Sequence, residues 1–278
     1  MNSKVAAYVA LVRPFNCVMT FVSIAAAVVI CSGDSIHLLP LLVAPLTGLL
    51  VAGGANAIND YFDVEIDRVN RPDRPLPSGR LQKRDAWIVW SVLSAAGVLI
   101  NFALRPLALV IALLSVALLY GYSRSLKQTV LVGNVAVATM TAMAFIYGGV
   151  ASGEIFKSMV PALFAFLSNL ARELVKDAED VRGDALQKAA TLPVAYGATV
   201  ALRMASVVLI VLICSTLAAS LLKIYTPRFL YLVLIVDIAL GFVAVALWRS
   251  PAPRRLRFLS TMLKGAMAGG LVAIYLGS

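Results

Sequence analysis

Charged residues and histidine are both scarce in this sequence, and their scarcity excludes several kinds of active site. Charged residues make up 14% of the chain, only 14 residues are acidic, and His37 is the single histidine. A zinc site built on histidines and a triad that needs a histidine base are therefore excluded. His37 falls in a predicted external loop and is a poor candidate for catalysis.

Cysteines and processing signals are rare as well. Cys17, Cys31 and Cys214 stand alone in apolar segments, without the spacing of metal ligands, and we interpret them as packing residues. Lys4 and Arg13 precede an apolar run with no clearly placed small-residue cleavage site. We therefore expect this run to be retained and not removed as a signal peptide.

Hydrophobic residues, by contrast, make up 61% of the chain, and the mean hydropathy is +0.90. Several apolar runs reach the roughly 20 residues that a helix needs to cross a bilayer. Backbone groups inside a bilayer must be satisfied within each span, so we predict an all-α, polytopic membrane protein. The net charge of +10 fits cytoplasmic loops near anionic lipid, and no aromatic-basic motif supports binding to nucleic acid.

Nine transmembrane helices are predicted from these runs. They cover residues 13–31, 41–62, 86–104, 106–121, 130–150, 159–176, 193–222, 229–248 and 256–276. Seventeen of the 24 lysines and arginines fall on the side that holds the N-terminal segment, and four fall on the other. Because basic residues mark the cytoplasmic side, we expect the N-terminus to be cytoplasmic and the C-terminus to lie outside.

The segment Asn59-Asp-Tyr-Phe-Asp-Val-Glu-Ile-Asp67 follows the second apolar run and holds many of the few acids. If it is helical, Asn59, Asp63 and Asp67 repeat every four residues and Asp60 falls three before Asp63, so all four share one face. Stacked carboxylates repel one another unless a cation lies among them, and oxygen ligands without His or Cys indicate Mg²⁺. Ordinary solvated acids at a helix end are the alternative.

The same spacing recurs 117 residues later at Asp177, Asp180 and Asp184. Both acidic segments are expected on the cytoplasmic side, where two such faces could hold two or more cations with a diphosphate between them. Because the helices that carry them are four apart, we predict two pseudo-repeated four-helix units, 13–127 and 130–249, followed by a ninth helix. Chance similarity is the alternative.

Basic and hydroxyl side chains near the first acidic segment are candidates for binding a diphosphate. Arg68 follows Asp67 directly, and its guanidinium fork matches phosphate oxygens. Tyr122 and Lys127 follow the fourth predicted helix on the same side of the membrane. The alternative for these residues is interfacial anchoring or the positive-inside bias.

Charged residues inside a membrane are usually paired or functional. Asn169, Arg172, Glu173 and Lys176 follow a helical face that continues to Asp177. Arg172 could pair with Glu173 or with an aspartate of the second segment, and it could also meet a substrate phosphate.

Three further polar residues lie in apolar surroundings. Asn16 and Asn134 could line a pocket, and interhelical hydrogen bonding is the alternative. Asp237 has no visible partner in the sequence.

Taken together, these motifs resemble those of the UbiA superfamily of intramembrane prenyltransferases. The matching segments are Arg13-Pro-Phe-Asn16, Asn59 to Arg68, Asn70 to Gly79, Tyr122 to Lys127, and Asp177 to Asp184. The resemblance covers nearly the whole chain. It implies nine helices around a central cavity, dependence on Mg²⁺, and a lateral opening to lipid for an isoprenoid tail.

More narrowly, the stretch from Arg172 to Asp184 resembles the archaeal branch of digeranylgeranylglyceryl phosphate synthases. The Tyr-Asp-rich second motif of the branch that prenylates 4-hydroxybenzoate is absent. The resemblance implies transfer of a geranylgeranyl group from its diphosphate to geranylgeranylglyceryl phosphate in the cell membrane. An aromatic prenyltransferase acting on 4-hydroxybenzoate, and a lipid-binding or transport protein, are the alternatives.

The hypothesis assigns roles to the residues of both segments. The predicted metal ligands are Asn59, Asp60, Asp63, Asp67, Asp177, Asp180 and Asp184, with Asp60 in a supporting role. Of these, Asp63, Asp67, Asp180 and Asp184 are the predicted catalytic residues. The predicted diphosphate ligands are Arg68, Tyr122, Lys127 and Lys176, and the predicted pocket residues are Asn16, Asn134 and Arg172.

Overall fold

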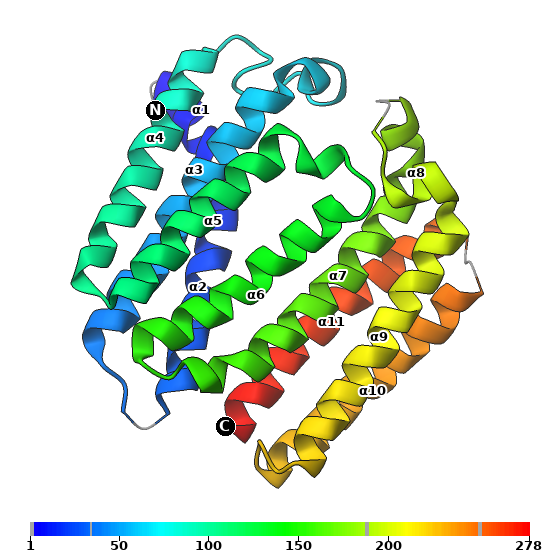
Figure 1. Cartoon of the computed structure of the whole chain (residues 1–278). Coiled ribbons are helices and arrows are strands. Elements are labelled where there is room, and N and C mark those ends of the chain that lie inside the picture. Colours follow the sequence, from blue (N-terminus) through cyan, green and yellow to red (C-terminus); the bar gives the residue numbers. More distant parts are fainter. Residues whose placement is uncertain (1–2, 34, 187–188, 250–251) are drawn as a thin grey trace. The chain divides into compact units, whose positions relative to one another are not determined.

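The structure is a computed structural model that describes residues 3–33, 35–186, 189–249 and 252–278 (Figure 1). The residues described form helices, turns and loops without a strand, which confirms the all-α prediction. The helices are α1 (Ser3–Val12), α2 (Pro14–Ser32), α3 (Leu38–Asn70), α4 (Lys83–Leu99), α5 (Pro106–Arg124), α6 (Val132–Ser152), α7 (Ile155–Leu186), α8 (Leu192–Tyr196), α9 (Ala198–Leu221), α10 (Pro227–Trp248) and α11 (Pro253–Gly277). Two 3₁₀ helices, η1 (Ile100–Ala103) and η2 (Leu126–Gln128), complete the set for these ranges.

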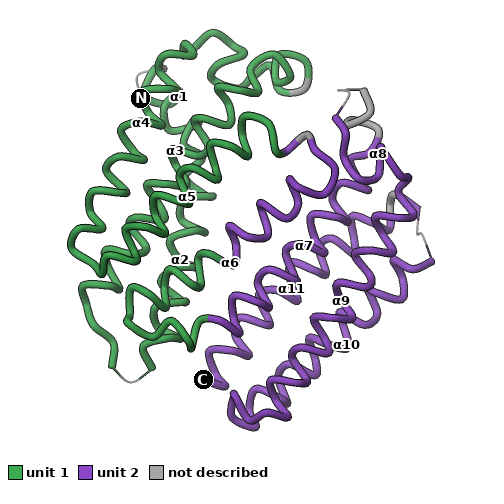
Figure 2. Tube along the Cα trace, in the orientation of Figure 1, with its two compact units in different colours: residues 1–126, 143–158 green, residues 127–142, 159–278 purple. Residues whose placement is uncertain are grey.

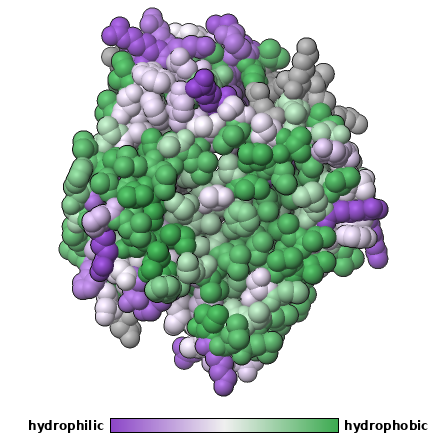
Figure 3. Space-filling model, viewed as in Figure 1, coloured by the Kyte–Doolittle hydropathy of each residue, from purple (hydrophilic) through white to green (hydrophobic). Residues whose placement is uncertain are grey.

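Nine helical stretches of the described chain are long and apolar enough to cross a membrane. They match the nine predicted spans in number and order, and the chain is a multi-pass membrane protein. Figure 3 shows hydrophobic side chains over the middle of the visible helices and hydrophilic side chains gathered near helix ends. The cytoplasmic location of the N-terminus stays a prediction.

A single residue of non-helical backbone interrupts the helices at two places. The first predicted helix, 13–31, agrees with α2 (Pro14–Ser32), but a further helix, α1 (Ser3–Val12), precedes it, and Arg13 between them adopts φ 52° and ψ 73°. The ring of Pro14 disfavours helical backbone at the residue before it, which accounts for the break. In the seventh, 193–222, Gly197 has φ 89° and separates α8 from α9. Hydropathy does not register a one-residue turn of this kind.

Two other predicted helices end too early. The second was expected to stop at Phe62 and the sixth at Lys176, whereas α3 continues to Asn70 and α7 to Leu186. A helix of 33 residues is about 50 Å long at 1.5 Å per residue, and the hydrocarbon core of a bilayer is about 30 Å thick. The polar end of α3 therefore extends beyond the apolar layer while its backbone hydrogen bonds continue.

The chain forms two compact units, coloured separately in Figure 2. Unit 1 consists of residues 1–126 and 143–158, and in it α3 packs against α1, α2, α4 and α5. Glycines allow α3 and α4 to approach closely, since a Cβ added at Gly54 would lie 2.9 Å from Ser94 Oγ. The division falls within α6 and near the start of α7. It reflects packing, so the predicted four-helix repeat stays a prediction.

A buried apolar cluster within unit 1 fixes the loop that follows α3. Its members come from α1, α3, α4 and that loop: Ala7, Leu11, Ala57, Val64, Leu76, Leu81 and Ala86. Leu76 and Leu81 are thus the apolar anchors of an otherwise polar loop. The polar end of α3, the loop and α1 are held together by this packing.

Unit 2 consists of residues 127–142 and 159–278, and in it α10 packs against α9 and α11. Interhelical hydrogen bonds join α9 and α10, because Ser206 Oγ donates to the carbonyl oxygen of Ala244 at 2.9 Å. Thr216 Oγ1 donates to Asp237 Oδ2 at 2.8 Å. Asp237 therefore has the interhelical partner that the sequence did not reveal.

Candidate active site

The first acidic segment is helical, which is the condition for its side chains to share one face, and it forms the last turns of α3. Asn59 Nδ2 donates to Asp63 Oδ2 at 2.9 Å, which is the i, i+4 contact that the spacing indicated. Asp60 and Asp67 lie seven positions apart on one face and are 2% and 5% exposed. The four predicted ligands of this segment thus form two pairs with different surroundings.

Two arginines compensate the buried pair. Arg74 lies in the loop after α3, and its Nη1 is 3.2 Å from Asp60 Oδ1 and 2.5 Å from Asp67 Oδ2. Arg13, at the junction of α1 and α2, bonds to the same Asp60 oxygen. Buried carboxylates are costly unless they are paired and hydrogen-bonded, so these arginines stabilise the polar end of α3.

Reasoning from the sequence missed both of these partners. Arg13 was read as part of the first span, although it belongs to the segment Arg13-Pro-Phe-Asn16 that carries the resemblance. Arg74 was read as one basic loop residue among several. Its position between Pro72 and Pro75, which stiffen the loop, was the available signal.

Arg68, the arginine expected to touch a substrate anion, points elsewhere. Its Nη1 bonds to Glu65 Oε2 at 2.6 Å, and both side chains are largely exposed. It directly follows Asp67 on α3, and its predicted role at the diphosphate stays a prediction.

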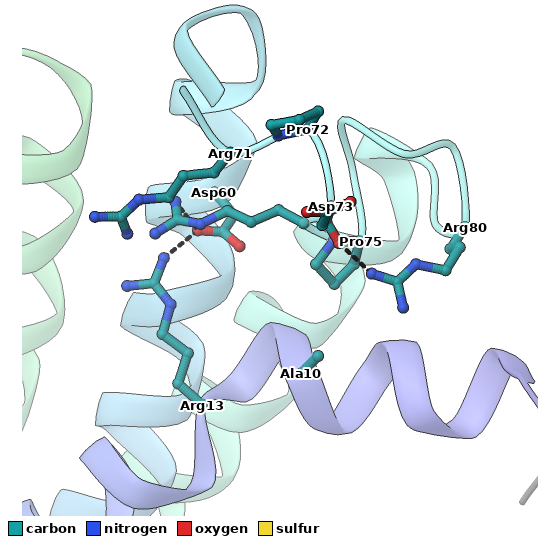
Figure 4. A pocket seen from close by; sticks show the side chains of 9 residues that line it. Ala10, Arg13, Asp60, Arg71, Pro72, Asp73, Pro75 and Arg80 are labelled. Carbon is teal, nitrogen blue, oxygen red and sulfur yellow. Dashed lines mark hydrogen bonds and ion pairs between the residues drawn. The ribbon is translucent and has the colours of Figure 1, made fainter. Parts of the chain in front are cut away.

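A cavity of about 390 Å³ opens beside Asp60, within unit 1 (Figure 4). Its walls come from α1, the α1–α2 junction, α3 and the loop that follows α3: Ala10, Arg13, Asp60, Arg71, Pro72, Asp73, Arg74, Pro75 and Arg80. We call it the arginine cavity. Four arginines and two aspartates among its nine lining residues make it strongly polar.

The second acidic segment is also helical and lies in the last turns of α7. Asn134 Nδ2, on α6, donates to Asp177 Oδ2 at 2.7 Å. Asp180 is exposed, and the side chain of Asp184 lies outside the part of the chain that the structure describes. The predicted pocket residue Asn134 and the predicted ligand Asp177 are therefore brought together.

The charges just before this segment pair with one another. Arg172 Nη1 is 2.6 Å from Glu173 Oε1, and Lys176 Nζ is 3.6 Å from Glu173 Oε2. The first of these contacts is one of the pairings expected for Arg172. Asn169 donates to Thr141 Oγ1 and thereby links α7 to α6.

The remaining predicted residues lie at helix ends. Tyr122 is partly buried in the last turns of α5, and Lys127 is partly buried in η2. Asn16 is exposed in the first turn of α2, close in sequence to Arg13. Their predicted roles toward substrate stay predictions.

Within the described ranges, no group of three or more His, Cys, Asp or Glu side chains lies close enough to hold a metal ion. The donor types nevertheless suit Mg²⁺, which prefers oxygen ligands. In phosphate-binding sites this ion commonly uses only one or two protein carboxylates, together with water and substrate phosphate. Asp63 with Asn59, and Asp177 with Asp180, supply donors of this kind.

Comparison with known proteins gives the same family from sequence and from structure. The model of the UbiA prenyltransferase family matches residues 20–264. Digeranylgeranylglyceryl phosphate synthase from Methanopyrus kandleri is 44% identical over 206 residues, which are 74% of this chain and 75% of the relative. A solved structure of a digeranylgeranylglyceryl phosphate synthase is 31% identical, with a TM-score of 0.89 over 99% of this chain and 98% of the other.

A more distant structure has the same fold. A UbiA homologue from Archaeoglobus fulgidus bound to DMAPP and Mg²⁺ is 17% identical, with a TM-score of 0.73 over 96% of this chain and 98% of the other. Homologues of this fold are thus known with a prenyl diphosphate and Mg²⁺ bound. The match to the family model over most of the length, with the two acidic segments in place, shows that this chain belongs to the UbiA prenyltransferase family.

Proposed function

We propose that this protein transfers a geranylgeranyl group from geranylgeranyl diphosphate to the free hydroxyl of geranylgeranylglyceryl phosphate, with Mg²⁺ as cofactor. The observation that carries the proposal is the similarity to digeranylgeranylglyceryl phosphate synthases, at 44% identity to one relative and along nearly the full length of a solved structure. The spacing of carboxylates on α3 and α7 supports it, because prenyl diphosphates need cations to neutralise the leaving group.

The metal would be held by the two acidic segments. On α3 the ligands are Asn59, Asp63 and Asp67, with Asp60 in support, and on α7 they are Asp177, Asp180 and Asp184. When bound, Mg²⁺ neutralises charge that builds on the leaving diphosphate. Preorganised cationic side chains would add to this stabilisation, and the candidates are Arg68, Tyr122 as a hydroxyl donor, Lys127, Lys176 and Arg172.

The reaction exchanges one carbon–oxygen bond for another. The allylic C–O bond to the diphosphate breaks, and the carbon is attacked by the hydroxyl oxygen of the acceptor to form an ether. The attacking hydroxyl releases its proton to an aspartate or to the departing diphosphate, so a strong base is not needed. Apolar helices around the site exclude water, which would otherwise capture the allylic carbon.

The site would open on the cytoplasmic side of the membrane. The excess of lysine and arginine on the side that holds both acidic segments supports this orientation. The two segments would belong to repeated four-helix units, 13–127 and 130–249, with the ninth helix added. Surrounding membrane lipid would accommodate the isoprenoid tails.

The test is a transfer assay in liposomes with radiolabelled geranylgeranyl diphosphate and Mg²⁺. Geranylgeranylglyceryl phosphate and 4-hydroxybenzoate are offered in parallel, each with and without EDTA. We expect labelled diether phosphate that disappears with EDTA. Product from 4-hydroxybenzoate alone would keep the metal chemistry and contradict the acceptor, and the absence of any transfer would contradict the proposal as a whole.

A further inference from the structure

We infer that the arginine cavity binds the phosphate of the lipid acceptor, at a place separate from the diphosphate of the donor. The inference rests on the proposed function, because it assigns a location to one of the two substrates named there. The cavity lies within unit 1, between the loop that follows α3 and the junction of α1 and α2 (Figure 4).

Internal contacts hold three of the four arginines of this cavity in place. Arg13 and Arg74 both bond to Asp60, whose side chain is almost fully buried. Arg80 Nε donates to Ser78 Oγ at 3.0 Å, and another nitrogen of its guanidinium donates to the carbonyl oxygen of Asp73. A site whose side chains are already ordered loses less conformational entropy when a ligand binds.

The loop backbone is ordered in the same way. The amide of Ser78 donates to the carbonyl of Arg74 at 3.0 Å, and the amide of Leu81 donates to the carbonyl of Pro75 at 3.0 Å. Leu76 and Leu81 anchor the loop in the apolar cluster beneath it. The polar side of the loop is thereby left to face the cavity.

The charge of the cavity matches a phosphate monoester. Four arginines and two aspartates give the lining a formal charge of +2, and a phosphate monoester carries about −1.5 to −2 at neutral pH. Figure 4 shows Arg71 and Arg13 reaching toward the same side of Asp60. Arg71 is exposed and forms no ion pair with a carboxylate of the described residues, so its guanidinium fork is available to a phosphate.

The same contacts argue against a metal-bound diphosphate in this cavity. A cation that bridges protein and diphosphate needs carboxylate oxygens as ligands. Of the proposed α3 ligands only Asp60, which has a supporting role, lines the cavity, and its carboxylate already accepts from Arg13 and Arg74. Arginines meeting phosphate directly, without a metal, is the arrangement expected for the acceptor's single phosphate.

The position and size of the cavity suit the headgroup of a lipid. The cavity lies at the polar end of α3, which extends beyond the apolar layer, so it lies on the headgroup side of that layer. A volume of 390 Å³ equals roughly 13 water molecules at about 30 Å³ each, which accommodates a glycerol phosphate but not an attached C20 chain. The C20 chain of the acceptor would leave the cavity along α2, where the side chains of Phe15, Met19 and Val22, which follow Arg13, are exposed.

The test compares the variant Arg71→Gln with the wild type in proteoliposomes, and Arg84→Gln is the matched control. Arg84 is an exposed arginine at the start of α4 that does not line the cavity. We expect Arg71→Gln to raise the KM for geranylgeranylglyceryl phosphate about tenfold, because a charged hydrogen bond is lost. The KM for geranylgeranyl diphosphate should not change, and Arg71→Lys should recover part of the loss.

Geranylgeranylglycerol, which lacks the phosphate, serves as a second acceptor. The wild type should use it poorly, and Arg71→Gln should be no worse on it than the wild type. Equal losses on both acceptors, an equal rise in the KM for the donor, or an unchanged KM for the phosphate acceptor would each overturn the inference. Absence of diether product from the wild type would instead contradict the proposed function on which the inference rests.

Discussion

The acidic segments of α3 and α7 have the same spacing of carboxylates but different neighbours. On α3, Asp60 and Asp67 are almost fully buried and accept from arginines of the chain itself. On α7, Asp177 accepts from the amide of Asn134, and Asp180 is exposed. A guanidinium compensates the charge of a carboxylate, whereas an amide only orients it.

The carboxylates of the two segments therefore differ in role, although their spacing in the sequence is the same. The pair Asp60 and Asp67 is tied to the loop after α3 and contributes to its stability and to the arginine cavity. The amide of Asn134 donates to Asp177, so Asn134 acts chiefly as a positioning residue for this carboxylate. Spacing along a helix therefore indicates which carboxylates share a face, but it does not say which groups compensate them.

The largest effect is expected from removing one carboxylate of each segment. Asp63→Ala and Asp180→Ala should each lower the transfer rate by about 100-fold or more, since each removes stabilisation of the charge on the leaving diphosphate. The measurement is labelled product formed per minute in liposomes. Glu154→Gln, a change at an exposed acid outside both segments, is the control and should leave the rate near that of the wild type. Normal activity in Asp180→Ala would show that only the segment on α3 is catalytic.

The next effect concerns stability and should be confined to α3. Arg74→Ala leaves Asp67 without its arginine and Asp60 with Arg13 alone, so we expect a loss of about 3 kcal/mol in the free energy of unfolding. Thermal unfolding in detergent measures it. Adding Asp67→Asn to the Arg74→Ala variant should restore part of the loss, because the uncompensated charge is removed.

Lys176→Ala is the matched change on α7. Lys176 is half exposed and lies 3.6 Å from Glu173, so its removal should cost less than about 1 kcal/mol. If Arg74→Ala and Lys176→Ala lowered the free energy of unfolding equally, the expected difference between a buried and an exposed ion pair would be contradicted.

The architecture could be predicted from the sequence because long apolar runs report bilayer thickness directly. All nine spans followed from hydropathy. The ends of α3 and α7 did not follow, since hydropathy falls where the helix leaves the apolar layer even though its hydrogen bonds continue. The turns at Arg13 and Gly197 are single-residue backbone features, which a windowed average does not detect.

The partners of the acidic residues could be predicted only where they are local. The contact of Asn59 with Asp63 follows from helical spacing, and that of Arg172 with Glu173 joins residues adjacent in the sequence. Arg13 reaches Asp60 across 47 positions of sequence, and this contact depends on the turn before Pro14. The fold of the loop after α3 likewise decides that Arg74, and not Arg68, bonds to Asp67.

A smaller effect should follow from removing the amide that orients Asp177. Asn134→Ala should lower stability by about 1 kcal/mol, the usual net value of one hydrogen bond, and should also lower the transfer rate. Asn169→Ala is the control, because Asn169 also links α7 to α6 but bonds to Thr141 and not to an acidic ligand. It should show a similar loss of stability with a smaller loss of rate. Equal losses of rate would indicate that the contact between α6 and α7 matters and that orientation of Asp177 does not.

The smallest effects are expected at the exposed ion pairs of the two segments. Arg257 pairs with Glu179 at 3.1 Å and Arg68 pairs with Glu65 at 2.6 Å, and both arginines are largely exposed. Arg257→Gln and Arg68→Gln should therefore each change the free energy of unfolding by less than about 0.5 kcal/mol. Because the two variants are expected to lose equally little stability, a difference between their kinetic constants would indicate that one of the two arginines contacts substrate. A raised KM for geranylgeranyl diphosphate in Arg68→Gln alone would support a role for Arg68 at the diphosphate, whereas unchanged kinetics in both would leave it an ordinary surface pair.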